Sequence, residues 1–78
     1  MSTADELVDA RLMTGPELRR LRLAAGLSQE DLAGLCGVEQ RTIGRWEQER
    51  QAIPHLACPG LRQILERAIQ ARALRNIK

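Results

Sequence analysis

Tyrosine and phenylalanine are absent from this 78-residue sequence, and Trp46 is its only aromatic residue. Sheet proteins usually build their cores from aromatic and β-branched residues, whereas leucine, isoleucine and alanine suit a small helical core. No apolar run approaches the roughly 20 residues of a membrane span, and the first residues are acidic where a secretory signal would be basic. We therefore expect one all-α domain over residues 1–78, in the cytoplasm and not in a membrane.

Histidine and cysteine are also scarce, which bears on metal sites and catalysis. His55 is the only histidine, and Cys36 and Cys58 lack C-x-x-C spacing, so a zinc site has too few ligands. No nucleophile stands at a readable spacing from a base. We expect no catalytic residue, no metal and no cofactor. Both thiols should be reduced, with Cys58 either exposed or capping a helix.

The net charge is only +2, from 12 basic and 10 acidic residues, but it is unevenly distributed. The first 18 residues are acidic, and residues 51–78 are basic. Arginine outnumbers lysine eleven to one, which favours bidentate contacts with phosphate or guanine, although a GC-rich genome produces the same bias. A chain this short buries only about 60% of its unfolded surface, so we expect marginal stability.

Capping residues mark where successive helices start. Thr14 and Glu17 have capping-box spacing and open a helix that Gly26 ends, and Ser28 precedes a second helix over residues 29–36. The expected buried residues of these two helices are Leu18, Leu21 and Ala25, then Leu32, Ala33, Leu35 and Cys36.

A third helix, after the turn at Gly37, has little to bury. Only Ile43 and Trp46 form an apolar stripe beyond Val38. Its opposite side, which must face something other than a core, carries Gln40, Arg41, Gly44, Arg45 and Gln48.

Pro54 and Pro59 interrupt the chain before a last helix over about residues 60–75. Arg72 and Arg75 then occupy the side of its apolar stripe, so its packing should end near residue 71. A short further helix is indicated by the capping-box spacing of Thr3 and Glu6. Together these segments predict a compact four- to five-helix bundle.

Residues 29–48, "QEDLAGLCGVEQRTIGRWEQ", have the spacing of a helix-turn-helix. Ala33 lies where two helices cross closely, and Gly37 makes the turn. Val38, Ile43 and Trp46 anchor the second helix by one edge. Its remaining surface can enter a major groove about 12 Å wide.

The longer run "GLSQEDLAGLCGVEQRTIGRWEQERQAIP" resembles the phage repressor and Cro-type, or Xre-like, helix-turn-helix regulators. The resemblance implies a lambda-repressor-like fold and binding of double-stranded DNA, with an ion pair between Arg22 and Glu47. The residues that it implies for reading bases are Gln40, Arg41, Gly44 and Arg45. Those that it implies for contacting phosphates are Gln29, Thr42, Arg50, Gln51 and His55.

Three features depart from the family pattern. Glu39 stands where the family often has a serine or threonine cap, and it either repels phosphates or accepts from cytosine N4. Gly44 permits close approach to DNA or is merely tolerated. The segment "HLACPG" breaks the usual fourth helix, which leaves the dimer surface open. The arginines of the last helix form either a solvated face or a second DNA contact: Arg62, Arg67, Arg72 and Arg75.

These features predict a dimeric, autoregulatory repressor that occludes an inverted-repeat operator. The dimer would use Ile69, Leu74 and Ile77 of the last helix, with Leu7, Val8 and Leu12. The alternative is an antitoxin or phage accessory module whose main role is to bind a protein partner.

Overall fold

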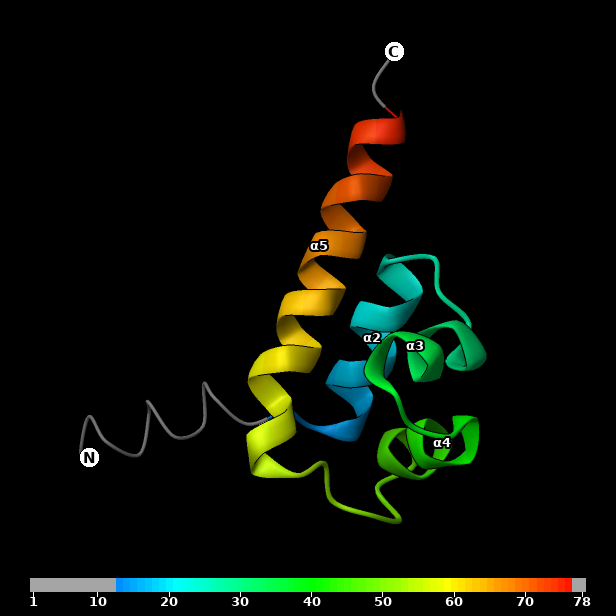
Figure 1. The fold of residues 1–78 in the computed structure, drawn as a ribbon, viewed down its shortest axis with the longest axis vertical. Coiled ribbons are helices and arrows are strands. Elements are labelled where there is room, and N and C mark those ends of the chain that lie inside the picture. Colours follow the sequence, from blue (N-terminus) through cyan, green and yellow to red (C-terminus); the bar gives the residue numbers. More distant parts are fainter. Residues whose placement is uncertain (1–12, 77–78) are drawn as a thin grey trace, which may run out of the picture.

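The structure, a computed structural model, describes residues 13–76, and within this range it contains helices and no strand (Figure 1). The expectation of an all-α fold is confirmed for these residues. The helix indicated at Thr3 and Glu6 lies outside them. In chain order the elements are α2 (Gly15–Ala24), α3 (Gln29–Cys36), α4 (Gln40–Glu47), the 3-10 turn η1 (His55–Ala57) and α5 (Cys58–Asn76).

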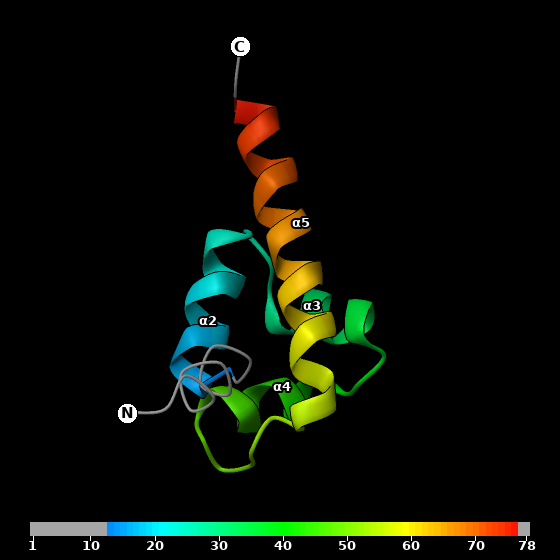
Figure 2. The same ribbon diagram turned by 90° about the vertical axis from the view of Figure 1, so that its left-hand side faces the viewer.

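Helix α2 is central to the packing because it contacts both α4 and α5, while α3 packs against α4. In both ribbon views α4 lies at the end of the molecule where α2 and α5 begin (Figures 1 and 2). Each element contributes apolar side chains to one shared core. Its fully buried members include Leu18, Leu32, Ile43 and Leu65, and Trp46 and Leu61 also belong to it.

The caps explain why α2 and α3 start where they do. The Thr14 hydroxyl accepts from the Glu17 amide at 3.2 Å, but Glu17 does not complete the box and pairs with Arg62 instead. At α3 both halves of the box are present, since the Ser28 hydroxyl accepts from the Asp31 amide and an Asp31 carboxylate oxygen accepts from the Ser28 amide. The predicted bounds of residues 29–36 are therefore confirmed.

The structure corrects the expected burial of two residues, Leu35 and Cys58. Leu35 was expected on the apolar side of α3, but it is 58% exposed. Cys58 was expected either exposed or in a capping role, yet it is buried and its thiol donates to the Pro54 carbonyl at 3.5 Å. Helix α5 starts at Cys58, two residues before the predicted start of the last helix, and Pro59 lies in its first turn, where proline is tolerated.

The packing of α5 also extends further than expected. Arg72 Nη1 donates to the carbonyl oxygens of Leu23 and Ala24 at 3.2 Å each, and so binds the C-terminal end of α2. A cation near the last carbonyls of a helix is favourable because of the helix dipole. Arg72 and Arg62 thus make contacts within the protein, which corrects the view of them as a purely solvated face. Beyond Arg72, Leu74 is 63% exposed.

Gly15 lies where the start of α2 approaches the end of α4 closely. A Cβ atom at this position would collide with the carbonyl oxygen of Trp46 and lie 2.8 Å from that of Glu47. The obstructing atoms belong to the backbone at the end of α4, so they cannot rotate away. The absence of a side chain at Gly15 thus allows the start of α2 to meet the end of α4.

We predict that Gly15→Ala destabilises the protein by about 1–3 kcal/mol, because the methyl group forces α2 and α4 apart. The matched control is Gly34→Ala in α3, where a Cβ meets nothing within 4 Å. That change should stabilise by up to about 1 kcal/mol through helix propensity alone. Thermal unfolding measures both, and equal melting temperatures for the two variants would contradict the close approach.

Candidate nucleic-acid interface

Helix α4 buries one narrow face and exposes the rest. Ile43, Trp46 and Glu47 are its buried residues. At about 100° per residue, the exposed residues lie within one sector of about 140° on the other side. These are Gln40, Arg41, Arg45 and Gln48, with the half-buried Gly44 among them. The structure thus brings the four residues expected to read bases onto one face.

The start of α4 has an unusual cap. Glu39 occupies the N-cap position, but its side chain makes no capping hydrogen bond. Its carboxylate oxygen Oε2 instead accepts from Arg41 Nε at 3.1 Å and from Arg41 Nη2 at 2.8 Å. Both side chains remain about two-thirds exposed. Arg41 is therefore held beside Glu39, whereas Arg45 has no carboxylate partner among residues 13–76.

A buried ion pair fixes the other end of α4. Arg22 of α2 donates from Nε and Nη2 to the two carboxylate oxygens of Glu47, at 2.6 and 3.1 Å. The third nitrogen, Nη1, donates to the Leu27 carbonyl at 2.9 Å. Side chains of this pair are no more than 10% exposed. The partnership implied by the family resemblance is thus present as a bidentate contact, which is the strong geometry for an arginine and a carboxylate.

Gln29 is part of the same network. Its amide nitrogen donates to Glu47 Oε1 at 3.2 Å, so the expected phosphate-contacting residue already has one partner inside the protein. Its amide group also lies 3.7–3.8 Å from the place where a Cβ of residue 44 would stand. This is ordinary van der Waals spacing, so the packing of the protein itself does not require glycine at position 44.

A polar hollow beside this network was missed by sequence reasoning. It has a volume of ≈ 240 Å³ and is lined by Arg19, Arg22, Gln29, Glu47 and Gln48. Arg19 is exposed and stands one helical turn before Arg22 in α2. The i, i+3 spacing of Arg19 and Arg22 could have indicated this hollow, because residues three apart lie on the same side of a helix.

Beyond α4 the backbone makes a sharp turn at Glu49, which has a positive φ of 59°. The Glu49 amide donates to the Trp46 carbonyl and the Arg50 amide to the Arg45 carbonyl, at 3.1 and 2.9 Å. These bonds form a Schellman ending, in which glycine is the usual residue at the left-handed position. Because residue 49 is a glutamate and not a glycine, this helix ending could not be predicted from the sequence. The turn fixes the backbone of Arg50 directly against α4.

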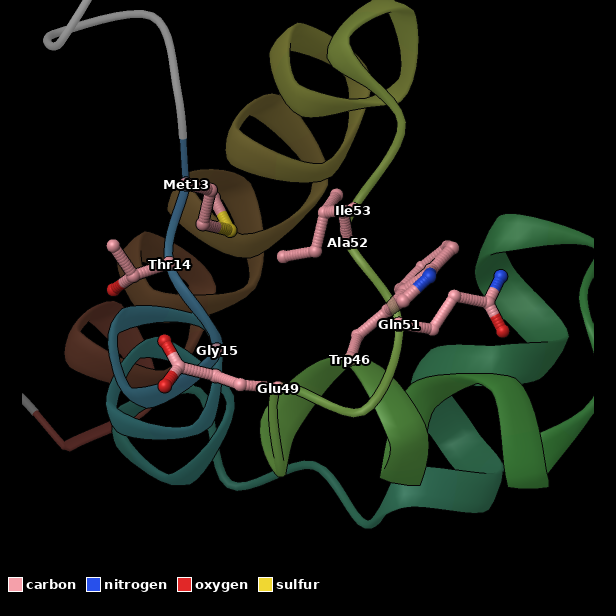
Figure 3. A pocket seen from close by; sticks show the side chains of 8 residues that line it. All are labelled: Met13, Thr14, Gly15, Trp46, Glu49, Gln51, Ala52 and Ile53. Atoms are coloured by element: carbon pink, nitrogen blue, oxygen red, sulfur yellow. The ribbon is translucent and has the colours of Figure 1, made fainter.

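The remaining expected phosphate contacts lie in α4, in the loop after it and at the start of η1. Thr42 is half-buried in α4, while Gln51 and His55 are exposed. Gln51 also lines a hollow of ≈ 380 Å³ beside Trp46 (Figure 3). Glu49 contributes a carboxylate to the same lining, which would repel a phosphate, so we do not assign this hollow to the interface.

The cysteines give no sign of a reactive or metal-binding site. Cys36 is half-buried, and desolvation raises the pKa of its thiol, which disfavours the reactive thiolate. Among the described residues, no cluster of histidine, cysteine and carboxylate side chains could hold a metal ion. No helix within residues 13–76 is long and apolar enough to cross a membrane.

Two short helices joined by a glycine turn, the second held by one edge and polar elsewhere, define a helix-turn-helix protein. A family profile described as a helix-turn-helix domain matches residues 15–75, and the chain belongs to this family. Helix-turn-helix domains are DNA-binding modules, so DNA is the partner that the family indicates. No curated protein and no solved structure matches the chain.

We predict that Glu47→Ala destabilises the protein by about 3–5 kcal/mol, because it leaves the Arg22 guanidinium buried without its carboxylate. Glu66→Ala, which removes an exposed carboxylate from α5, is the control and should change stability by less than about 0.5 kcal/mol. Urea unfolding measures the two free energies. A Glu47→Ala variant as stable as the control would show that the pair contributes nothing to the fold.

Proposed function

We propose that the protein is a sequence-specific regulator of the phage repressor and Cro type, which represses transcription by occluding an operator. The observation that carries this proposal is the face of α4, which is exposed, polar and positively charged although the helix is anchored in the core. A helix held by one edge is suited to the major groove. Occlusion of a promoter requires only that the DNA-bound protein cover it.

The base-reading residues in this proposal are Gln40, Arg41, Gly44 and Arg45. Arginine can pair with guanine O6 and N7, and glutamine with adenine N6 and N7. Gly44 lies among them without a packing need for glycine, which supports close approach of the DNA backbone or bases at this position.

The phosphate-contacting residues are Gln29, Thr42, Arg50, Gln51 and His55. Arg50 is the best supported of these because it is exposed and its backbone is fixed against α4 by the turn at Glu49. Gln29 stands at the start of α3, where amide groups favour an anion. Its bond to Glu47 would hold the side chain in place beside such an anion.

We further propose that two copies bind an inverted-repeat operator through a two-fold dimer. The last turns of α5 extend past the other helices (Figure 1), and Leu74 is exposed there. Ile69 is only partly buried against the core. The other residues expected in this dimer, Leu7, Val8, Leu12 and Ile77, lie outside the described residues.

The second candidate function is a protein-interaction module, such as an antitoxin or phage accessory factor. Leu35 and Leu56, which are 58% and 93% exposed, favour it. They flank a mainly apolar hollow of ≈ 230 Å³ whose lining includes Val38, Trp46 and Ile64. Exposed apolar groups around a hollow are typical of protein contacts.

We predict that Arg45→Ala weakens operator binding by about 1–3 kcal/mol and relaxes the preference at one base pair. Gln40→Ala should act similarly at an adenine. Arg50→Ala, the matched phosphate control, should weaken operator and random duplexes alike and lower the salt slope by about one unit. The affinities are measured by fluorescence anisotropy on a duplex selected from a random pool.

Equal losses on both duplexes for Arg45→Ala would reassign Arg45 to a phosphate. If the folded Arg45→Ala and Arg50→Ala variants bound DNA as the parent does, α4 would not enter DNA and the partner-binding function would be favoured.

We predict that the protein sediments as a dimer and that its half-sites lie about 10 base pairs apart, or a multiple of this. Leu74→Glu should dissociate the dimer, because it places a charge in an apolar contact of α5. Leu35→Glu is the control, since Leu35 is similarly exposed but lies on α3. Sedimentation velocity reports both, and dissociation by Leu35→Glu alone would move the dimer contact to α3.

A further inference from the structure

Glu39 is a carboxylate where a DNA-binding face should be cationic, and it does not cap α4. A carboxylate at this place repels phosphates, and a serine would cap the helix better. Within residues 13–76, the only hydrogen bonds of its side chain are those from Arg41. Any role of the Glu39 side chain therefore involves its contact with Arg41.

The geometry of the pair leaves a defined part of Arg41 available. A guanidinium has five N–H donors, and four of them form two edges of two parallel N–H groups, one edge from Nε and Nη2 and the other from Nη1 and Nη2. Glu39 Oε2 occupies the first edge, at 3.1 and 2.8 Å. The second edge has no partner among the residues that the structure describes, and its two parallel N–H groups match the O6 and N7 acceptors of guanine.

We propose that Glu39 is a positioning residue that orients Arg41 for bidentate contact with a guanine, and so determines specificity at one operator base pair. This inference rests on the proposed function, since it assumes that α4 enters the major groove. In this proposal Glu39 contacts and orients Arg41, and it neither accepts from a cytosine nor caps α4.

Two physical effects make such positioning useful. An unrestrained arginine samples many rotamers and can bind any nearby phosphate, whereas a carboxylate on one edge reduces this freedom. The negative charge of Glu39 also offsets that of Arg41, so the pair adds little to non-specific attraction for DNA. Removal of water in the groove would strengthen the contact between the two side chains, because charges interact more strongly in a lower dielectric.

The structure supplies an internal comparison in Arg45. This residue lies on the same face of α4, but no carboxylate contacts it within residues 13–76. Loss of Glu39 should therefore affect discrimination at the base pair read by Arg41 and leave the one read by Arg45 unchanged.

The test compares the parent protein, Glu39→Gln, Arg41→Ala and the double variant on the selected operator and on duplexes with each base pair replaced. Glu39→Gln keeps the size of the side chain but removes its charge. It should lower discrimination at the Arg41 base pair about tenfold, while raising affinity for random duplexes. In the Arg41→Ala background it should cause no further loss of discrimination, because Glu39 acts through Arg41.

A second variant, Glu39→Ser, separates specificity from stability. Serine can cap α4, so the melting temperature should stay the same or rise, yet discrimination at the Arg41 base pair should fall as in Glu39→Gln. A loss of discrimination that tracked loss of folding in both variants would overturn the proposal.

Three other outcomes would each indicate a different explanation. A loss that persists in the Arg41→Ala background would show that Glu39 reads a base itself. Tighter binding to all duplexes with unchanged discrimination would show that Glu39 only repels phosphates. Absence of any operator preference in the parent protein would instead contradict the proposed function, and is thus distinguishable from failure of this inference.

Discussion

The contact between Arg22 and Glu47 is the interaction on which the placement of α4 depends. Helix α4 has eight residues, a glycine within it and no side-chain cap, so its intrinsic helical stability is low. The bidentate pair ties its end to α2, and the bonds from Arg22 to Leu27 and from Gln29 to Glu47 extend the tie to the start of α3. One buried carboxylate thereby fixes three segments against each other.

This arrangement also requires that the end of α4 approach α2 closely. Gly15 removes the side chain that would separate the two helices, and the turn at Glu49 leads the chain away from the contact. A non-glycine residue in the left-handed conformation costs about 1–2 kcal/mol. The Glu49 side chain lies over Gly15, near the start of α2, where a negative charge is favourable. That favourable position offsets part of the backbone cost.

Local signals predicted most of the helix boundaries because caps and turn glycines act over a few residues. Ser28, Asp31 and Gly37 defined α3 correctly, and Ile43 and Trp46 identified the buried edge of α4. Contacts between distant segments could not be predicted from these local signals. The need for glycine at position 15 depends on backbone atoms of α4, and the role of Arg72 depends on free carbonyl groups at the end of α2. The pair of Arg22 and Glu47 came only from the family resemblance.

The candidate site was predicted as a set of residues, but not as a set of contacts. Helical periodicity placed Gln40, Arg41 and Arg45 on one face, since it depends only on spacing. It could not show that Arg41 is held by Glu39, because side-chain direction depends on both rotamers. The two arginines of this face therefore differ in a way that their spacing does not reveal. Within residues 13–76 no carboxylate contacts Arg45, whereas Glu39 offsets the charge of Arg41. In the proposed complex both arginines would read bases, and Arg45 would supply more of the electrostatic attraction to DNA.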